Sequence, residues 1–305
     1  MGDAAPATAA SAASAADVDG IGVFETGFSI LFNVPEINLG EPGWVVPVRV
    51  PGLARTVSLQ VPDIDARNTS LFAHHVWKAS ILLARLLAAA QPAADVAGRT
   101  VVELGAGTGL PSIAAGMLGA RAVVASDFPD AAILDALRRN LDVNLRPAGT
   151  RGGDGGDQGG QGGQGGDDDD IAARCHVVGH VWGDDPAPLL HHAGPGGFDV
   201  VLLADTFWMA HQHDNLLADV TALLAPQGVV LAVAGLHTGR RTMEAFFDKA
   251  AREHALVVER LAIVEVPVGS GSGDELVWNT VPDDAEIPDT IEERMRYLFA
   301  YRITR

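Results

Sequence analysis

A glycine-rich turn and two carboxylates are the residues of this sequence whose types and spacing suggest chemistry most clearly. The stretch VVELGAGTGL is an apolar strand that runs through Gly105, Gly107 and Gly109 into a helix, and Glu103 stands two positions before the first glycine. Asp127 ends the next apolar stretch, RAVVASD. Parallel strands bring their carboxyl ends to one edge of a sheet, where ligands of open α/β sheets bind. We therefore expect the turn and both carboxylates to face one ligand.

The spacing of the glycines separates two classes of nucleotide ligand. Dinucleotide-binding turns follow G-x-G-x-x-G, but Leu110 stands where the third glycine of that pattern would be. A carboxylate at Glu103 would oppose a pyrophosphate and favour a ligand with an amine or a sulfonium. Asp127 is placed to bind both hydroxyls of a ribose, and ribose recognition without phosphate recognition points to S-adenosylmethionine. The alternative is structural, with Glu103 capping backbone amides and Asp127 capping the next helix.

Strands and helices alternate along the chain from residue 100 onward. The apolar stretches predicted as strands are 100–104, 121–127, 173–183, 198–205 and 228–235, and the helical patterns between and after them are 110–119, 130–145, 186–193, 213–225 and 240–254. This alternation predicts an α/β fold, a mostly parallel sheet with helices on both faces. Two further strands, 255–266 and 295–304, predict an antiparallel hairpin that ends in a C-terminal edge strand.

Other segments differ in composition from this repeating part. Residues 1–24 are rich in Ala and Ser and lack the features of a targeting peptide, so we predict a disordered tail. A small β-ribbon over 28–62 and an amphipathic helix over 69–90, capped by Thr69 or Ser70, come next within a segment of 25–95. The Gly/Asp insert 148–170 is too polar and glycine-rich to fold alone. We expect one domain over residues 25–305.

The overall composition bounds the partners of the protein. The net charge of −18 argues against a nucleic-acid partner, which requires clustered Lys and Arg, and would attract a basic protein. The acidity can equally serve solubility alone. No apolar run reaches the roughly 18 residues that span a membrane. A single cysteine, Cys175, fits a reducing compartment, and we expect a cytoplasmic monomer.

Several segments together resemble the methyltransferases of family 16. They are HHVWKAS (74–80), the glycine turn, SDFPD (126–130), HVWGDDPAPLL (180–190) and VLLADTFWMAHQHDNLL (201–217). The nearest match is a fungal nicotinamide N-methyltransferase-like branch that is similar to the N-terminal and lysine methyltransferase of elongation factor 1-alpha. The resemblance implies a seven-strand Rossmann-like sheet, S-adenosylmethionine as cofactor and a cytoplasmic protein substrate.

The resemblance also assigns site residues. The family's cofactor contacts map onto Trp77, Glu103, Gly105, Gly107, Asp127, Trp182 and Ala204, and we add their neighbours Ala106, Thr108, Gly109 and Phe128. From the residues alone, Trp182 ends a strand beside a glycine, where its ring would stack on the adenine. Core packing is the alternative for Trp182 and for Trp77.

We predict that the amine that accepts the methyl group binds at the end of the fourth strand. We expect Asp205 to orient the acceptor amine, with the cap of the following helix as the alternative. Phe207 and Trp208 would either wall an apolar slot or pack in the core, and family members often carry Asn or Tyr near this place. Paired histidines occur without cysteine or carboxylate partners, so we expect no metal. A small-molecule N-methyltransferase and a non-catalytic cofactor-binding module remain as rival functions.

Overall fold

The structure, a computed structural model, describes residues 38–63, 75–89, 94–146, 171–236, 238–267, 276–287, 290, 294 and 296–305. The predicted tail (1–24) and the predicted Gly/Asp insert (148–170) lie outside these residues. Within the described ranges, no helix is both long and apolar enough to cross a bilayer.

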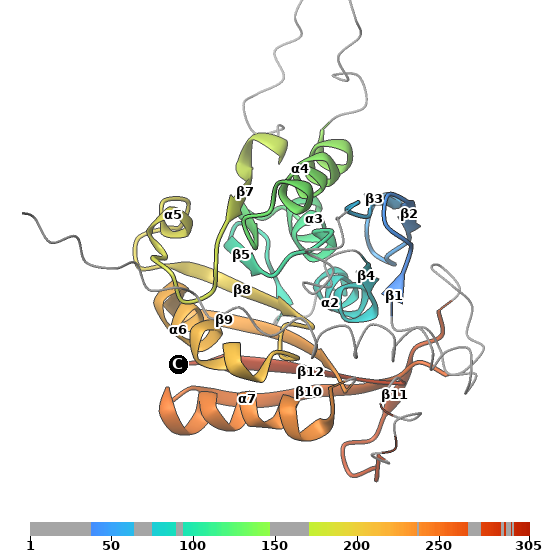
Figure 1. Ribbon diagram of the computed structural model, residues 1–305, viewed down its shortest axis with the longest axis vertical. Helices are drawn as coiled ribbons and strands as arrows, with labels where there is room; N and C mark the ends of the chain where they lie inside the picture. Colours follow the sequence, from blue (N-terminus) through green and yellow to red (C-terminus); the bar gives the residue numbers. More distant parts are fainter. Residues whose placement is uncertain are drawn as a thin grey trace, which may run out of the picture.

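Eight strands of the described chain form a central sheet (Figure 1). In spatial order they are β11 (Asn279–Val281), β10 (Val257–Glu265), β12 (Tyr297–Thr304), β9 (Leu224–Gly235), β8 (Phe198–Ala204), β5 (Thr100–Leu104), β6 (Ala122–Asp127) and β7 (Cys175–Gly179). The five strands from β9 to β7 pair in parallel. The predicted α/β class and the mostly parallel Rossmann-like sheet are confirmed.

The C-terminal strand, β12, lies two places inside the edge of the sheet at which we predicted it. β12 is antiparallel, as expected, but it lies between β9 and β10, and β10 and the unpredicted β11 form the edge. β12 buries Leu298, Phe299, Ala300 and Ile303, whereas much of β10 is exposed or half-buried. The more apolar strand therefore takes the interior place, where both of its faces and both of its edges are covered.

Helices cover both faces of the sheet (Figure 1), and each face is packed with its own hydrophobic cluster. One face carries α2 (Lys78–Ala88), α3 (Leu110–Met117) and α4 (Ala131–Leu145), and the other carries α5 (Ala187–Leu190), α6 (His213–Leu223) and α7 (Arg240–Glu253). Val101 and Val123 belong to the first cluster, and their neighbours Val102 and Val124 belong to the second. Successive side chains of a strand point to opposite faces, so strands that are covered on both faces are apolar throughout.

An N-terminal ribbon docks on α4 through two asparagines. β2 (Val45–Val48) and β3 (Val57–Gln60) form an antiparallel hairpin, which confirms the predicted ribbon. Asn140 exchanges two hydrogen bonds with the backbone of Gln60, and Asn144 exchanges two with Ser58, at distances between 2.7 and 2.9 Å. The two side-chain amides pair with the backbone N–H and C=O groups at the open edge of β3, as a neighbouring strand would. Asn140 also donates to the carbonyl of Thr108 at 3.0 Å, which ties the ribbon to the glycine turn.

The helix predicted over 69–90 begins later in the structure. α2 begins at Lys78, and Val76–Trp77 form a short strand, β4, that pairs with β1 (Asn38–Leu39). The proposed caps, Thr69 and Ser70, lie outside the described residues. Pairing with β1 keeps Val76 and Trp77 extended, so a tertiary contact overrides the helical spacing. Trp77 thereby becomes the residue that precedes the first turn of α2.

Candidate functional site

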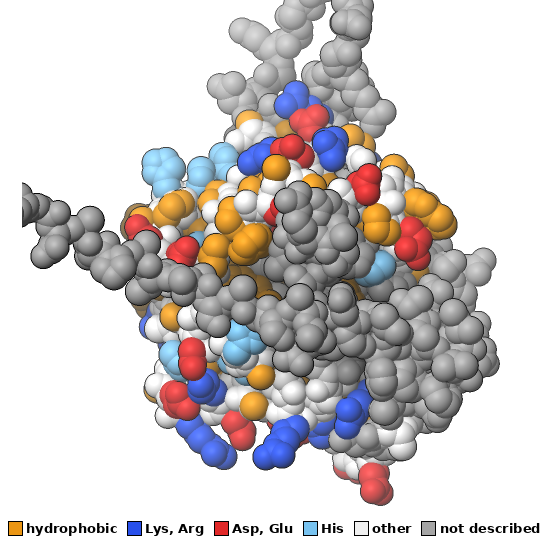
Figure 2. Space-filling model, in the orientation of Figure 1, with side chains coloured by type: hydrophobic (Ala, Val, Ile, Leu, Met, Phe, Trp, Pro, Cys, Tyr) orange, Lys and Arg blue, Asp and Glu red, His pale blue; other side chains and the backbone are white. Residues whose placement is uncertain are grey.

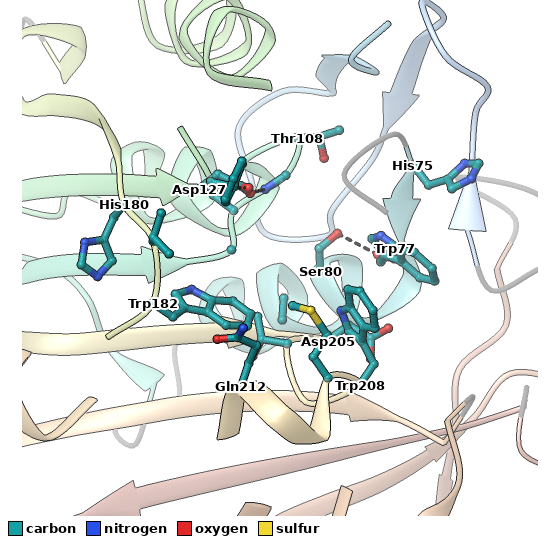
Figure 3. A pocket seen from close by; sticks show the side chains of 18 of the residues that line it. His75, Trp77, Ser80, Thr108, Asp127, His180, Trp182, Asp205, Trp208 and Gln212 are labelled. Atoms are coloured by element: carbon teal, nitrogen blue, oxygen red, sulfur yellow. Dashed lines mark hydrogen bonds between the residues drawn. The ribbon is translucent and has the colours of Figure 1, made fainter. Parts of the chain in front are cut away.

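A cavity opens at the carboxyl ends of β5, β6 and β8, the edge of the sheet where the sequence predicts a ligand. The empty space in the cavity and at its mouth, open solvent included, is about 1190 Å³. Ten of the twelve predicted site residues line it: Trp77, Gly105, Ala106, Gly107, Thr108, Asp127, Phe128, Trp182, Ala204 and Asp205. Figure 3 shows Trp182 on the His180 side, Asp205 with Trp208 and Trp77 on the other, and Asp127 across from them.

The glycine turn combines two different requirements for glycine. Gly109 precedes α3 with a φ of +79°, and a Cβ there would lie 2.4 Å from Leu137 Cδ1, so close packing of α3 on α4 excludes a side chain. Gly107 has a φ of +52°, but a Cβ there would meet no atom within 4 Å. Gly109 therefore serves the fold, while Gly107 leaves its backbone uncovered at the cavity wall.

Asp127 holds the glycine turn in place from the end of β6. Its Oδ2 accepts a hydrogen bond from the Gly107 amide at 2.6 Å, and its Oδ1 accepts one from the Phe128 amide at 2.7 Å. Burial raises the pKa of this carboxyl to about 6. Asp130, not Asp127, caps α4, so the capping alternative for Asp127 is wrong. An ionised carboxylate has lone pairs left for two further donors, such as ribose hydroxyls.

Glu103 lies behind the turn and does not line the cavity. Its side chain is 1% exposed, and Oε2 accepts hydrogen bonds from the Ser112 amide at 2.9 Å and the Ser112 hydroxyl at 2.5 Å, in the first turn of α3. Burial raises its pKa to about 8, and the nearby Asp127 adds to the rise. The contact of Glu103 with the ligand stays a prediction, and the structure shows the bond that the alternative describes, in which the carboxyl accepts from a backbone amide, that of Ser112.

Replacing Glu103 with glutamine is expected to remove a pH dependence of stability. The folded protein holds this proton up to about pH 8, whereas the ordinary pKa of a glutamate is 4.5. Between these values the folded state binds more protons, so the free energy of unfolding falls as the pH rises from 4.5 to 8. Glu103→Gln keeps an oxygen for Ser112 and cannot ionise. Compared with wild type, it should gain a few kcal/mol of stability between pH 5 and pH 8, at roughly 1.4 kcal/mol per pKa unit.

Urea denaturation of both proteins at pH 5 and pH 8 measures this difference. Glu103→Ala is the control. It loses both hydrogen bonds with Ser112, so it should be less stable than Glu103→Gln at each pH. If the free energies of unfolding of wild type and Glu103→Gln differ by the same amount at pH 5 and pH 8, the prediction is contradicted.

Trp182 leans over the start of the glycine turn. A Cβ on Gly105 would lie 3.1 Å from Trp182 Cζ2 and 3.0 Å from Thr206 Cγ2, so only glycine allows the indole this close to the backbone. The ring is half-buried, packs partly on the hydrophobic cluster of α6, and lines the cavity. An aromatic face at this place is suited to stacking on a purine.

Asp205 forms the opposite end of the cavity in a strained backbone conformation. Its φ is +59°, its amide donates to the carbonyl of Val233 at 2.8 Å, and its Oδ1 accepts from the Gly235 amide at 3.1 Å. Two anchors to β9 thus hold a conformation that few non-glycine residues adopt. α6 begins at His213 after Gln212, so the alternative role of Asp205 as the cap of this helix is wrong.

The two aromatic residues after Asp205 have different roles. Phe207 is 3% exposed and packs against Phe246 and Phe247 of α7 at ring distances of 4.4 and 5.2 Å. Trp208 lines the cavity beside Asp205 (Figure 3). Residues of the cavity wall that the sequence analysis did not assign are His75, Ser80, His180, Val181, Thr206, Met209, Gln212 and Thr238. Thr206 and Met209 lie two and five residues after the end of β8 at Ala204, in the segment that also contains Asp205 and Trp208.

The histidine pairs separate into structural and surface groups. His213 is buried, shares a hydrogen bond of 2.8 Å with the Phe207 carbonyl, and has a pKa lowered by burial. His176 stacks on His192 at 4.0 Å, and Figure 2 shows histidines gathered at this edge of the molecule, over α5 and β7. Within the described ranges, no group of three or more His, Cys, Asp or Glu is arranged to hold a metal.

Known proteins resemble this chain in sequence and in fold. A family described as lysine methyltransferase matches residues 60–150. The protein N-terminal and lysine N-methyltransferase EFM7 of Eremothecium gossypii is 34% identical over 242 residues, which cover 78% of this chain and 77% of the relative. The Candida glabrata protein of the same name is 29% identical over 81% of this chain and 86% of its own. SMU.776, a methyltransferase solved with S-adenosylhomocysteine, shares the fold with a TM-score of 0.51 at 13% identity, over 87% of this chain and 57% of its own.

Proposed function

This chain belongs to the family of protein N-terminal and lysine N-methyltransferases, enzymes that use S-adenosylmethionine, and on that premise we propose how its cavity methylates an amine of a protein. Membership confirms the resemblance to methyltransferase family 16. The observation that carries the proposal is that the glycine turn, Asp127, Asp205 and Trp208 line one cavity (Figure 3). A methyl donor and an amine must meet in one site for direct transfer, because alignment supplies most of the catalysis.

The proposed place of the cofactor follows from the groups along the wall. Asp127 would accept the two ribose hydroxyls, and Trp182 would cover the adenine. The uncovered backbone at Gly107 would allow the nucleoside to approach closely. Glu103 is buried, and burial raises its pKa to about 8, so it is mostly neutral at pH 7. Asp127 and Asp205 are then the carboxylates on the wall that favour a cationic sulfonium.

The acceptor amine would lie between Asp205, Trp208 and Trp77. When bound, S-adenosylmethionine would supply an electrophilic methyl group to the lone pair of this amine, and its sulfur would keep the bonding electrons as S-adenosylhomocysteine. The amine must first lose a proton to water, which costs a lysine about 4.6 kcal/mol at pH 7 and a chain-terminal amine about 1 kcal/mol. Aromatic walls favour the neutral amine, because they replace water around it. Asp205 then orients the amine rather than accepting its proton.

The relatives that are similar in sequence are named for two kinds of amine, a protein N-terminus and lysine. We propose that this chain also methylates both kinds of amine. The proposed substrate is elongation factor 1-alpha, and the proposed compartment is the cytoplasm. The net charge of −18 favours a basic substrate. Acidic and basic side chains are mixed over α7, where Arg252 pairs with Asp248 and Lys249 with Asp214, so the described part of that face has both signs (Figure 2).

Incubation of the purified full chain with methyl-labelled S-adenosylmethionine tests the proposal. Elongation factor 1-alpha with a free N-terminus should gain label, and mass spectrometry of its peptides identifies the acceptor. A substrate with an acetylated N-terminus isolates methylation of lysine. Label in nicotinamide or another small molecule alone would favour the small-molecule rival. Binding of S-adenosylhomocysteine without transfer to any acceptor would favour the non-catalytic module.

A further inference from the structure

A buried carboxylate outside the cavity fastens the turn that carries Trp182. Asp219 of α6 is 2% exposed. Its Oδ2 binds His180 Nε2 at 2.9 Å and accepts a hydrogen bond from the Gly183 amide at 3.2 Å. His180 and Gly183 stand on either side of Val181 and Trp182 in the chain. One oxygen atom of α6 therefore holds both ends of the turn.

The packing around Gly183 supports the same arrangement. Its φ is +87°, and a Cβ there would lie 2.8 Å from Asn215 Oδ1, one helical turn before Asp219. The His180 amide donates to the carbonyl of Asp127 at 2.8 Å, which joins the start of the turn to the end of β6. The turn is thus fixed between α6 and the strand end that carries Asp127.

We propose that Asp219 is a positioning residue for the cofactor, which holds the turn 180–183 so that the Trp182 indole stays at the adenine end of the cavity. The inference rests on the proposed function, because it places the adenine against Trp182. Asp219 does not line the cavity, whereas His180, Val181 and Trp182 do. Its effect on the ligand is therefore indirect. By holding the turn in place before binding, Asp219 would reduce the conformational entropy that the turn loses when the ligand binds.

Titration of S-adenosylhomocysteine by calorimetry tests Asp219 directly. Asp219→Ala should raise the Kd roughly 10- to 100-fold, because two hydrogen bonds to a charged acceptor are lost. Asp219→Asn can place an oxygen where Oδ2 lies, accept both hydrogen bonds, and stay within about threefold of wild type. In turnover assays, Asp219→Ala should raise the KM for S-adenosylmethionine and leave kcat within about twofold, because Trp182 is proposed to contact the adenine and not the acceptor amine.

A double variant separates a role through Trp182 from a general loss of structure. Trp182→Ala weakens binding by itself, and adding Asp219→Ala should then change the Kd by less than about twofold. Losses that add fully in the double variant, or a fall in kcat with an unchanged KM, would overturn the inference. If Asp219→Ala does not fold, Asp219→Leu fills a similar volume without an acceptor and provides the same comparison.

The binding assay keeps this inference separate from the proposed function. Wild-type protein that binds S-adenosylhomocysteine but transfers no methyl group would overturn the proposed function, while the Asp219 variants still decide the inference. Wild-type protein that binds and transfers, with a Kd that Asp219→Ala leaves unchanged, would overturn the inference alone.

Discussion

Asp127→Ala is expected to weaken binding of S-adenosylhomocysteine by roughly 10²- to 10⁴-fold. Two ribose hydroxyls that donate to a charged acceptor contribute about 1.5–3 kcal/mol each, and both are lost. The variant also releases the Gly107 amide, which Asp127 holds at 2.6 Å. Isothermal calorimetry on the purified full chain measures the loss.

The same variant should abolish a pH dependence of binding. Burial raises the pKa of Asp127 to about 6, and the ribose hydroxyls bind the ionised form. The affinity of the wild type for S-adenosylhomocysteine should therefore be highest above pH 7. It should fall as the pH drops through 6, by about tenfold for each pH unit below 6. Titrations between pH 5 and pH 8 check this slope.

Asp130→Ala is the matched control for Asp127. Asp130 lies three residues further along the chain, and its side chain caps α4 by accepting from the Ala132 and Ile133 amides. Its removal should cost about 1 kcal/mol of stability and leave the Kd unchanged. An Asp127→Ala variant that binds as tightly as Asp130→Ala would show that Asp127 has no contact with the ligand.

Asp205→Asn is expected to lower kcat roughly 10- to 150-fold, with the Kd for S-adenosylhomocysteine within about threefold of wild type. Asparagine tolerates the φ of +59° at this position, and its oxygen can still accept from the Gly235 amide at 3.1 Å. Its NH₂ group, however, cannot accept a hydrogen bond from the substrate amine. The substitution therefore removes orientation of the amine and preserves the backbone.

Steady-state kinetics with a protein substrate measure this effect. Asp199→Asn, at the other end of β8, is a suitable control, because Asp199 accepts from the amide and hydroxyl of Thr100 at 2.8 and 2.9 Å. It should change stability and leave kcat unaffected. Full turnover of Asp205→Asn, with unchanged affinity for the acceptor, would exclude the proposed role of Asp205.

The strands, most of the helices and the edge of the sheet that holds the cavity were predictable, because the patterns that indicate them involve residues close together in the sequence. Apolar runs that end in glycine or aspartate identify strand ends, and parallel strands bring those ends together whatever their order in the sheet. Gly105, Gly107 and Asp127 line the cavity for this reason, whereas Trp77 was assigned through the family resemblance alone. The place of β12 was not predictable in the same way, because the order of strands depends on which apolar faces meet after the chain collapses.

Glu103 shows what the spacing of a carboxylate near a strand end leaves open. Its position near the end of β5 is the same kind of position as that of Asp127, so the sequence alone assigned both to the ligand. In the folded chain Ser112 of α3 binds Glu103, which leaves Asp127 at the cavity wall. S-adenosylmethionine is still the cofactor, because the family of the chain indicates it without any role of Glu103.

By itself, the sequence determined the α/β fold, the glycine turn and the strand end that carries Asp127, because periodicity and spacing are properties of neighbouring residues. Tertiary structure alone decided that Phe207 packs on α7 while Trp208 lines the cavity, since their chain positions are equivalent. Asp219 has no local signal at all. Its contacts with His180 and Gly183 exist only because α6 packs against a turn 36 to 39 residues earlier in the chain.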